Sequence, residues 1–302
     1  MNTKSGYVAI LGLPNAGKST LMNSLLGQKL SIVTPKPQTT RKAILGILSS
    51  ENYQVIFLDT PGIIKPEYLL QEKMMSAVSE SAKDADIVIL IIDISHDADG
   101  QNILKNEFID NDLLKLGKPL LLLLNKIDLN EQEKVKKIIS NYESLKIFKK
   151  VIPISALLNF NLQDVINTIV ELLPEGPKYY PDDIVAEESE RFFVSEIVRE
   201  KVFELYKEEI PYSTEVIIED FKEREENKDY ILAEIIVEKE SQKGIIIGKQ
   251  GAAIKRLGLE ARKAVEDFLQ KEVYLELRVK VKTKWRTDER QLKSFGYIKP
   301  KD

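Results

Sequence analysis

The chain has 302 residues, of which 43% are hydrophobic and 30% are charged, and it contains no cysteine. This length suggests about two domains, and the composition is that of a globular protein. The lack of cysteine excludes disulfides and cysteine–metal sites and suits a reducing compartment. The longest apolar runs, such as residues 120–124, are too short to span a bilayer, so we expect a cytoplasmic protein with no transmembrane segment.

The formal net charge of −4 hides an asymmetry within the second half of the chain. Residues 183–240 hold 8 Lys and Arg against 19 Asp and Glu, whereas residues 241–302 hold 16 against 8. The basic segment could bind a polyanion. The alternative is that the two segments face each other or the solvent, and charge alone does not decide between these interpretations.

Five short apolar runs in the first half predict the central strands of a parallel sheet that is buried on both faces. Helical patterns fall between the runs, at residues 68–82, 103–116, 131–140 and 162–172. This alternation predicts a doubly wound α/β domain whose ligand site lies at the carboxyl ends of the strands. The predicted strands are residues 8–11, 55–58, 87–92, 120–124 and 151–154.

The first strand runs into Gly-Leu-Pro-Asn-Ala-Gly-Lys-Ser at residues 12–19, which fits the phosphate-binding loop pattern G-x-x-x-x-G-K-[ST]. Backbone N–H groups of such a loop wrap phosphate oxygens at the positive end of a helix. Lys18 is expected to reach the β- and γ-phosphates, and Ser19 to bind Mg²⁺. The alternative is a glycine-rich turn that matches by chance. The predicted nucleotide-binding residues here are Asn15, Ala16, Gly17, Lys18, Ser19 and Thr20.

A second motif, Asp59-Thr60-Pro61-Gly62, follows the second predicted strand. Asp59 is placed to hold Mg²⁺ through water, and Gly62 can offer its N–H to a γ-phosphate because glycine permits a close approach. Seen alone, this stretch could equally be a Pro-Gly turn after a strand.

Two further motifs, Asn125-Lys126-Ile127-Asp128 and Ser155-Ala156, follow the fourth and fifth predicted strands. The Asp128 carboxylate can accept two N–H bonds from the Watson–Crick edge of guanine, a donor pair that adenine lacks. Asn125 can tie this loop to the phosphate loop, the Lys126 stem can cover the base, and the N–H of Ala156 can donate to guanine O6. A site that leaves buried polar groups unpaired with the wrong ligand discriminates strongly.

These motifs stand in the right order, each just after an apolar strand, and the sequence resembles the translation-factor-related class of GTPases. The resemblance implies a threonine in the first mobile loop, residues 30–42, that binds Mg²⁺ in the GTP state. By that resemblance Thr40 is the expected ligand, with Thr39 as the fallback.

Catalysis is expected to be slow, because Ile63 stands where small signalling GTPases carry a water-orienting glutamine. In similar GTPases an asparagine at the position of Asn15 helps to hold K⁺ near the phosphates; the alternative is that Asn15 only shapes the loop. The predicted catalytic residues are therefore Lys18, Thr40, Gly62 and Asn15. The single histidine, His96, lies in a polar loop and is expected to be solvated rather than catalytic.

Prolines and a glycine break the pattern after residue 173, which predicts a first domain at 1–173, a linker at 174–182 and a second domain at 183–302. In the second domain the pattern of apolar residues predicts a helix at 191–208, strands at 214–221 and 230–237, a helix at 253–268 and an alternating strand at 273–281. A G-x-x-G loop precedes the 253–268 helix. This order resembles an α+β KH domain of the prokaryotic type II topology.

The loop Gly248-Lys249-Gln250-Gly251 is the expected clamp on a nucleic-acid backbone, with Lys249 contacting phosphate. Ile245 and Ile246 beside it would belong partly to the core and partly to the wall of the base-binding groove. The tail offers Lys284, Trp285 and Arg286 for phosphate contact and stacking. The alternative for Trp285 is that it anchors the last helix.

A P-loop GTPase domain followed by a type II KH domain resembles the bacterial Era family along essentially the whole chain. The resemblance implies a monomeric ribosome-assembly GTPase with GTP or GDP, Mg²⁺ and K⁺ as cofactors. It also implies binding to the 3′ region of 16S rRNA and action on the 30S subunit precursor. Peripheral association with the inner membrane is reported for the family, although no membrane element is visible in the sequence. Three rivals are a small-molecule phosphotransferase, an RNA-binding protein with a vestigial nucleotide site, and a related GTPase for another RNA or single-stranded DNA.

Overall fold

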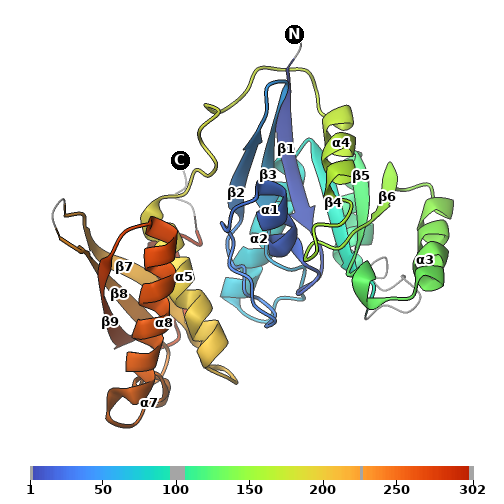
Figure 1. Cartoon of the computed structure of the whole chain (residues 1–302). Helices are drawn as coiled ribbons and strands as arrows, with labels where there is room; N and C mark the ends of the chain where they lie inside the picture. Colours follow the sequence, from blue (N-terminus) through green and yellow to red (C-terminus); the bar gives the residue numbers. More distant parts are fainter. Residues whose placement is uncertain (1–2, 96–105, 225–226, 299–302) are drawn as a thin grey trace. The chain divides into compact units, whose positions relative to one another are not determined.

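The computed structural model describes residues 3–95, 106–224 and 227–298 (Figure 1). By their contacts the residues form two compact units. The first unit comprises residues 1–31, 40–65 and 74–187, and the second comprises residues 32–39, 66–73 and 188–302. Two short stretches from the first half of the sequence therefore group with the second unit. His96 and residues 103–105 of a predicted helix lie outside the described residues.

The first unit contains a six-stranded sheet in the order β2-β3-β1-β4-β5-β6. All neighbouring strands are parallel except β2 and β3, which are antiparallel. The continuous apolar runs of β4 and β5 are buried on both faces, as predicted for central parallel strands. The strands are β1 (Lys4–Leu11), β2 (Ile44–Ser49), β3 (Tyr53–Asp59), β4 (Ile87–Asp93), β5 (Leu120–Asn125) and β6 (Lys150–Pro153).

Helices cover both faces of this sheet. Apolar residues of α2 and α3 share one buried cluster with β1, β4 and β5, whereas α1 and α4 lie on the opposite face (Figure 1). The α-helices are α1 (Lys18–Leu26), α2 (Leu69–Asp84), α3 (Gln132–Ser144) and α4 (Leu162–Leu172). In the described part of the predicted helix at 103–116, residues 107–116 are helical without a break, and they end in the π-helix η2 (Ile109–Leu113) and the 3₁₀ turn η3 (Leu114–Leu116). A further turn, η4 (Ile127–Leu129), follows β5.

The second unit contains a three-stranded sheet in the order β7-β8-β9. β7 (Glu215–Lys222) and β8 (Asp229–Val237) are antiparallel, and β9 (Val273–Val281) is parallel to β8. The crossover from β8 to β9 consists of α7 (Glu240–Ile247), the turn η5 (Lys249–Gly251) and α8 (Ala252–Leu269). The remaining elements are α5 (Glu190–Leu205), α6 (Ile210–Ser213), η6 (Trp285–Thr287) and α9 (Glu289–Ser294).

The core of the second unit lies between one face of this sheet and the helices α5 and α8. Val198 and Val202 of α5, and Leu257 and Ala261 of α8, are fully buried in one cluster with alternate residues of β8. Strict alternation in β9, whose apolar residues from Leu275 to Val281 pack against this cluster, and helical periodicity in α5 and α8 are the patterns on which the predicted α+β arrangement depends. The turn η5, which belongs to the G-x-x-G loop, lies directly before the first residue of α8.

Candidate nucleotide site and nucleic-acid interface

The phosphate loop connects β1 to α1 with a backbone that two glycines permit. Gly17 has a φ of 101° and lies at the N-terminus of α1. A Cβ atom on Gly17 would lie 2.2 Å from Nδ2 of Asn125, and one on Gly12 would lie 2.4 Å from the Ile91 carbonyl oxygen. Neither position can therefore accept a side chain without moving its neighbour. Asn15, also left-handed at φ 63°, is exposed.

Lys18 extends its ammonium group into the curl of this loop. Its Nζ donates hydrogen bonds to the carbonyl oxygens of Leu13 (2.9 Å) and Gly12 (3.2 Å). Burial lowers the pKa of Lys18 to about 8, while the negative charge of Asp59 opposes that shift. The site thus holds a desolvated cation at the place where the motif predicts the β- and γ-phosphates.

Three oxygen-bearing side chains meet beside Lys18. The Ser19 hydroxyl donates to Oδ2 of Asp59 (2.7 Å) and lies 2.9 Å from Oγ1 of Thr40. Asp59 is fully buried, and its Oδ1 has no hydrogen-bond partner among the described residues. Burial raises the pKa of Asp59, although the Ser19 hydrogen bond and the Lys18 charge act in the opposite direction.

This set of donors fits Mg²⁺, which prefers oxygen ligands, retains several waters and is commonly bound by one or two carboxylates with substrate phosphates. The part of the chain that the structure describes contains no group of three or more His, Cys, Asp and Glu side chains suited to a metal. A metal at Ser19, Thr40 and Asp59 would therefore depend on hydroxyl, water and phosphate oxygens beside a single carboxylate. The assignment of these residues as ligands stays a prediction.

Thr39, the fallback ligand, is directed elsewhere. Its Oγ1 lies 2.7 Å from Oγ1 of Thr34 and donates to the Lys36 carbonyl oxygen (2.7 Å). Of the two adjacent threonines, Thr40 is therefore the one whose hydroxyl lies beside Ser19. The geometry favours the predicted choice of Thr40.

Asn125 connects the phosphate loop to the loops that follow β5 and β6. Its Nδ2 donates to the Ala16 carbonyl oxygen (2.8 Å), and its Oδ1 accepts the Ala156 N–H (3.0 Å). This tie to the phosphate loop is the one that the sequence predicts for Asn125. Asp128 in the same loop is exposed, and its carboxylate has no hydrogen bond or ion pair with any other described residue.

The contact between Ala156 and Asn125 bears on one part of the prediction. The Ala156 N–H, expected to donate to guanine O6, already donates to Asn125. The next N–H, that of Leu157, donates to no acceptor within the described residues. A tight turn presents it, because Ser155 and Phe160 form an isolated antiparallel bridge. Only tertiary geometry separates these two adjacent donors, and the sequence analysis named only Ala156.

Ile63 agrees with the expectation that no side chain after Gly62 orients water. It is 2% exposed and belongs to the hydrophobic cluster beneath α2 and α3. Its N–H donates to the Gly12 carbonyl oxygen (3.0 Å), which fixes the backbone of this segment against the phosphate loop. A Cβ on Gly62 would lie 2.8 Å from the Pro14 nitrogen, so glycine is required there for this close approach.

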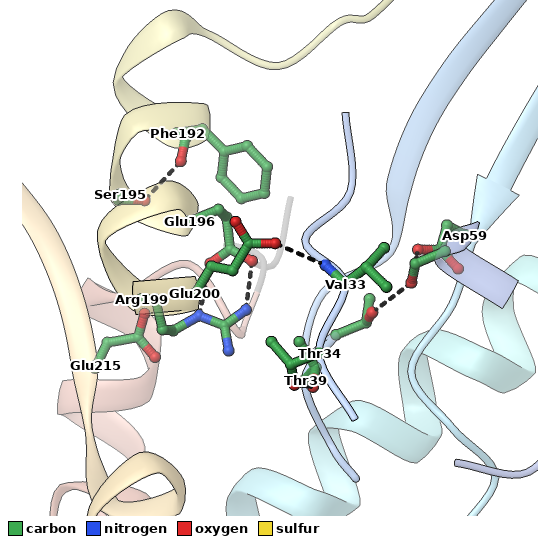
Figure 2. A network of polar contacts seen from close by, with 12 residues as sticks. Val33, Thr34, Thr39, Asp59, Phe192, Ser195, Glu196, Arg199, Glu200 and Glu215 are labelled. Atoms are coloured by element: carbon green, nitrogen blue, oxygen red, sulfur yellow. Dashed lines mark hydrogen bonds and ion pairs between the residues drawn. The ribbon is translucent and has the colours of Figure 1, made fainter. Parts of the chain in front are cut away.

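Residues 32–39, which belong to the second unit, contact α5. The Val33 N–H donates to Oε1 of Glu200 (2.9 Å), and Lys36 donates to the carbonyl oxygens of Phe203 and Tyr206 at the end of α5. Figure 2 shows Glu200 directed toward Val33, beside the Glu196–Arg199 ion pair of the same helix. A lysine at a helix C-terminus satisfies carbonyl groups that lack intrahelical partners. The loop that ends at Thr39 is therefore fixed to a helix of the second unit.

The G-x-x-G loop forms the turn η5 between α7 and α8. Gly248, Gln250 and Gly251 have φ values of 73°, 51° and 77°. A Cβ on Gly248 would lie 2.5 Å from that of Ala253, so this position needs glycine for the approach of α8. Lys249 and Gln250 are exposed. The loop therefore presents backbone and one cation to solvent at the start of a helix, as a clamp on a nucleic-acid backbone requires.

Two predicted RNA contacts disagree with the structure. Ile246 is fully buried in the core beneath α8, whereas Ile245 is 50% exposed, so only Ile245 can line a groove. Trp285 is also fully buried; its Nε1 donates to the Ser213 carbonyl oxygen (2.9 Å), and its ring contacts Phe295 edge-on. The indole therefore anchors the C-terminal segment and is not available for stacking.

The neighbours of Trp285 differ in their accessibility. Lys284 is exposed, as a phosphate contact would require. Arg286 is partly buried, forms an ion pair with Glu238 (Nε to Oε2, 3.0 Å), and lies 4.9 Å from the ring centroid of Tyr68 within the same unit. A phosphate contact by Arg286 would have to compete with both of these interactions.

The exposed face of α8 carries cations that the sequence analysis did not single out. They follow the clamp at helical spacing and flank the half-exposed Leu259, while Leu257, Ala261 and Val265 face the core. Three carboxylates of α8, those of Glu260, Glu266 and Asp267, share the solvent-facing side of the helix with these cations. None of the cations pairs with another described residue. The positive face consists of Lys255, Arg256, Arg262 and Lys263.

Comparison with known families matches both units. Residues 7–126 match the model of the 50S ribosome-binding GTPase family, and residues 209–286 match that of the KH domain. GTPase Era of Clostridium kluyveri is 46% identical over 97% of this chain and 99% of its own length. The chain belongs to the Era family of GTPases.

Relatives of this Era-family chain include plastid proteins and solved structures. Chloroplastic GTPase ERA1 of maize is 50% identical over 98% of this chain and 71% of its own length. A crystal structure of Era with MgGDPNP and nucleotides 1506–1542 of 16S ribosomal RNA is 40% identical, with a TM-score of 0.93 over 98% of this chain and 99% of that one. An Aquifex aeolicus Era variant bound to GDP·AlF₄⁻ gives the same identity, TM-score and coverage.

The predicted fold of two domains agrees with these matches. Among the described residues, no helix combines the length and the apolar character needed to cross a membrane.

Proposed function

We propose that this chain binds GTP and GDP with Mg²⁺ in the first unit and hydrolyses GTP slowly. The observation that carries this proposal is the double hydrogen bond of Asn125, which joins the phosphate loop to the loop after β6. It holds the predicted base-recognition groups at a fixed place relative to the phosphate cradle. Asp128 accepts the two guanine N–H groups, and the Leu157 N–H donates to O6 beside the Ala156 N–H that Asn125 holds.

In this proposal the chain's own groups stabilise charge rather than activate water. Lys18 and the N–H groups of the phosphate loop neutralise the developing negative charge, and Gly62 donates to the γ-phosphate. Mg²⁺, held by Ser19 and Thr40 with Asp59 behind a water, would neutralise the β- and γ-oxygens. Asn15 contributes by holding K⁺ near the phosphates. Equal rates of GTP hydrolysis in KCl and in NaCl would contradict this role of Asn15.

We further propose that the second unit binds the 3′ region of 16S rRNA and that the chain assists maturation of the 30S subunit in the cytoplasm. The Era crystal structure with nucleotides 1506–1542 supports the choice of RNA. The exposed Lys249 and Gln250 between two glycines with positive φ support the clamp. An RNA of equal length but unrelated sequence, and single-stranded DNA of the same sequence, are the competitors that test this choice.

The nucleotide proposal is tested by exchanging the groups that read the base. Asp128→Asn replaces two acceptors with one acceptor and one donor, which suits the N1–H and C2 carbonyl of xanthine. We expect GTP affinity to fall by about 100-fold, the loss of one or two charged hydrogen bonds, while xanthosine triphosphate affinity rises. Isothermal titration of both nucleotides measures this. Unchanged GTP affinity in the variant would contradict the assignment of Asp128.

A further inference from the structure

The ends of β4 and β5 place an unassigned carboxylate beside the base-recognition loop. These strands pair in parallel with Asp93 opposite Asn125, so Asp93 lies one residue out of register from Lys126. Oδ2 of Asp93 accepts a hydrogen bond from Nζ of Lys126 (2.6 Å), and the side chain of Asp93 is 13% exposed. Its other oxygen accepts the N–H and the hydroxyl of Ser95. Both carboxylate oxygens are thus used, and the orientation of the group is fixed.

Lys126 itself is held in a conformation that few side chains adopt. Its backbone is left-handed, with φ 63° and ψ 37°. Its carbonyl oxygen accepts the Leu129 N–H (3.1 Å) and Nδ2 of Asn130 (2.9 Å), which stabilise that turn. With the backbone fixed at one end and the ammonium bound to Asp93 at the other, the four-carbon stem between them has little freedom.

A second tie joins the same two loops. Nζ of Lys134, on α3, donates to Oδ1 of Asn130 (2.8 Å) and to the Ile94 carbonyl oxygen (3.1 Å). The residue after Asp93 and the residue that caps the Lys126 turn are therefore bridged independently of the Asp93–Lys126 pair. Removing Asp93 should consequently release the Lys126 stem without releasing the whole loop.

We propose that Asp93 is a positioning residue for guanine-nucleotide binding, acting through Lys126. It holds the ammonium at the end of β4, so that the methylene stem forms a prearranged apolar wall against the purine plane. Without this contact the stem would have to be ordered on each binding event, which weakens affinity by the cost of fixing a flexible side chain. The inference rests on the proposed guanine site.

The proposed role predicts a change in the nucleotide dissociation rate and no change in the rate at saturating GTP. Both oxygens of Asp93 are bound by Lys126 and Ser95 and make no contact with nucleotide in this proposal, so its loss should weaken GTP and GDP equally and leave the rate at saturating GTP unchanged. Because prearranged contacts act mainly on residence time, most of the effect should be in the dissociation rate. A residue needed for the phosphate chemistry would instead change the saturating rate.

The test measures dissociation of a fluorescent GDP analogue from the full-length chain. Asp93→Ala should raise the dissociation rate by about tenfold, and Asp93→Glu should restore part of the loss. Lys126→Met keeps the stem and removes the ammonium; in that background Asp93→Ala should change the rate by less than twofold, because the two residues act as one unit. The matched control is Asp164→Asn, which breaks an ion pair of the same 2.6 Å length with Lys150 in the same unit.

Two results would overturn the inference while leaving the guanine site intact. One is a dissociation rate in Asp93→Ala within twofold of the unmodified chain. The other is an equal increase with and without the Lys126 ammonium, which would mean that Asp93 acts on the fold and not through Lys126. Failure of the unmodified chain to bind the GDP analogue would instead contradict the proposed function itself.

Discussion

Lys18 is a buried cation whose charge depends on what surrounds it. Its pKa, lowered to about 8 by burial, should rise when phosphates bind, because their negative charge favours the ammonium. Nucleotide binding should therefore take up a proton above about pH 8, and affinity should fall there by up to about tenfold per pH unit. Titration of GDP binding between about pH 7 and about pH 9 measures this. Lys18→Arg keeps its charge throughout this range, so its affinity should not show the decline; a decline of equal size would contradict Lys18 as its source.

Trp285 is expected to matter for stability. Removing its buried ring leaves a cavity and an unpaired Ser213 carbonyl oxygen, so Trp285→Ala should lower the free energy of unfolding by about 3–5 kcal/mol. Tyr274→Ala is the control, because that ring is 59% exposed, and it should cost about 1 kcal/mol or less. Denaturant unfolding measures both. Equal, small losses in the two variants would mean that Trp285 does not anchor the second unit.

Single residues also mark where sequence reasoning stops. The consecutive isoleucines Ile245 and Ile246 have the same chemistry, yet Ile245 is half-exposed and Ile246 is buried. The difference arises because only one side of α7 faces the core, and the rotation of the helix decides which isoleucine lies on that side. The sequence around Trp285 is compatible with stacking and with anchoring, and only the burial of its ring decides between them. Motif residues such as Ser19, Asp59 and Asn125 could be predicted because their spacing after apolar strands fixes which strand end they occupy.

At the scale of elements, the central strands were predictable because parallel strands buried on both faces give continuous apolar runs. The edge strand β2 was missed: Ile44–Ser49 mixes buried and half-buried positions, includes Gly46, and directly follows a predicted loop. The contact of the Val33 N–H with Glu200 joins residues 167 positions apart through a backbone group, so no local pattern could indicate it.

The basic face of α8 gives a prediction about RNA. Lys255 and Arg256 lie at its start, next to the clamp, and have no ion-pair partner among the described residues. Replacing both with Gln should weaken RNA binding and reduce the slope of log affinity against log salt by about 1.4, or about 0.7 for each lost phosphate contact. The same replacement of the exposed Lys137 and Lys149 in the first unit is the control. Salt titrations that give an unchanged slope would show that α8 makes no phosphate contacts.

For the whole molecule, the boundary between the two units at Thr39 and Thr40 is the feature of most consequence. Thr40 lies beside Ser19 in the nucleotide site, whereas the preceding residues, 32–39, belong to the unit that carries the G-x-x-G clamp. Thr40 is thus continuous in sequence with a segment that is hydrogen-bonded to α5. We therefore propose that nucleotide binding biases RNA binding, in which case linkage requires that RNA biases nucleotide binding equally.

The most direct test of this account is the affinity of the full-length chain for the 3′-terminal single strand of 16S rRNA, measured with a non-hydrolysable GTP analogue and with GDP. We expect binding to be at least about tenfold tighter with the GTP analogue, a coupling of about 1.4 kcal/mol. Equal affinities in the two nucleotide states would contradict the claim that the nucleotide site controls the RNA-binding unit.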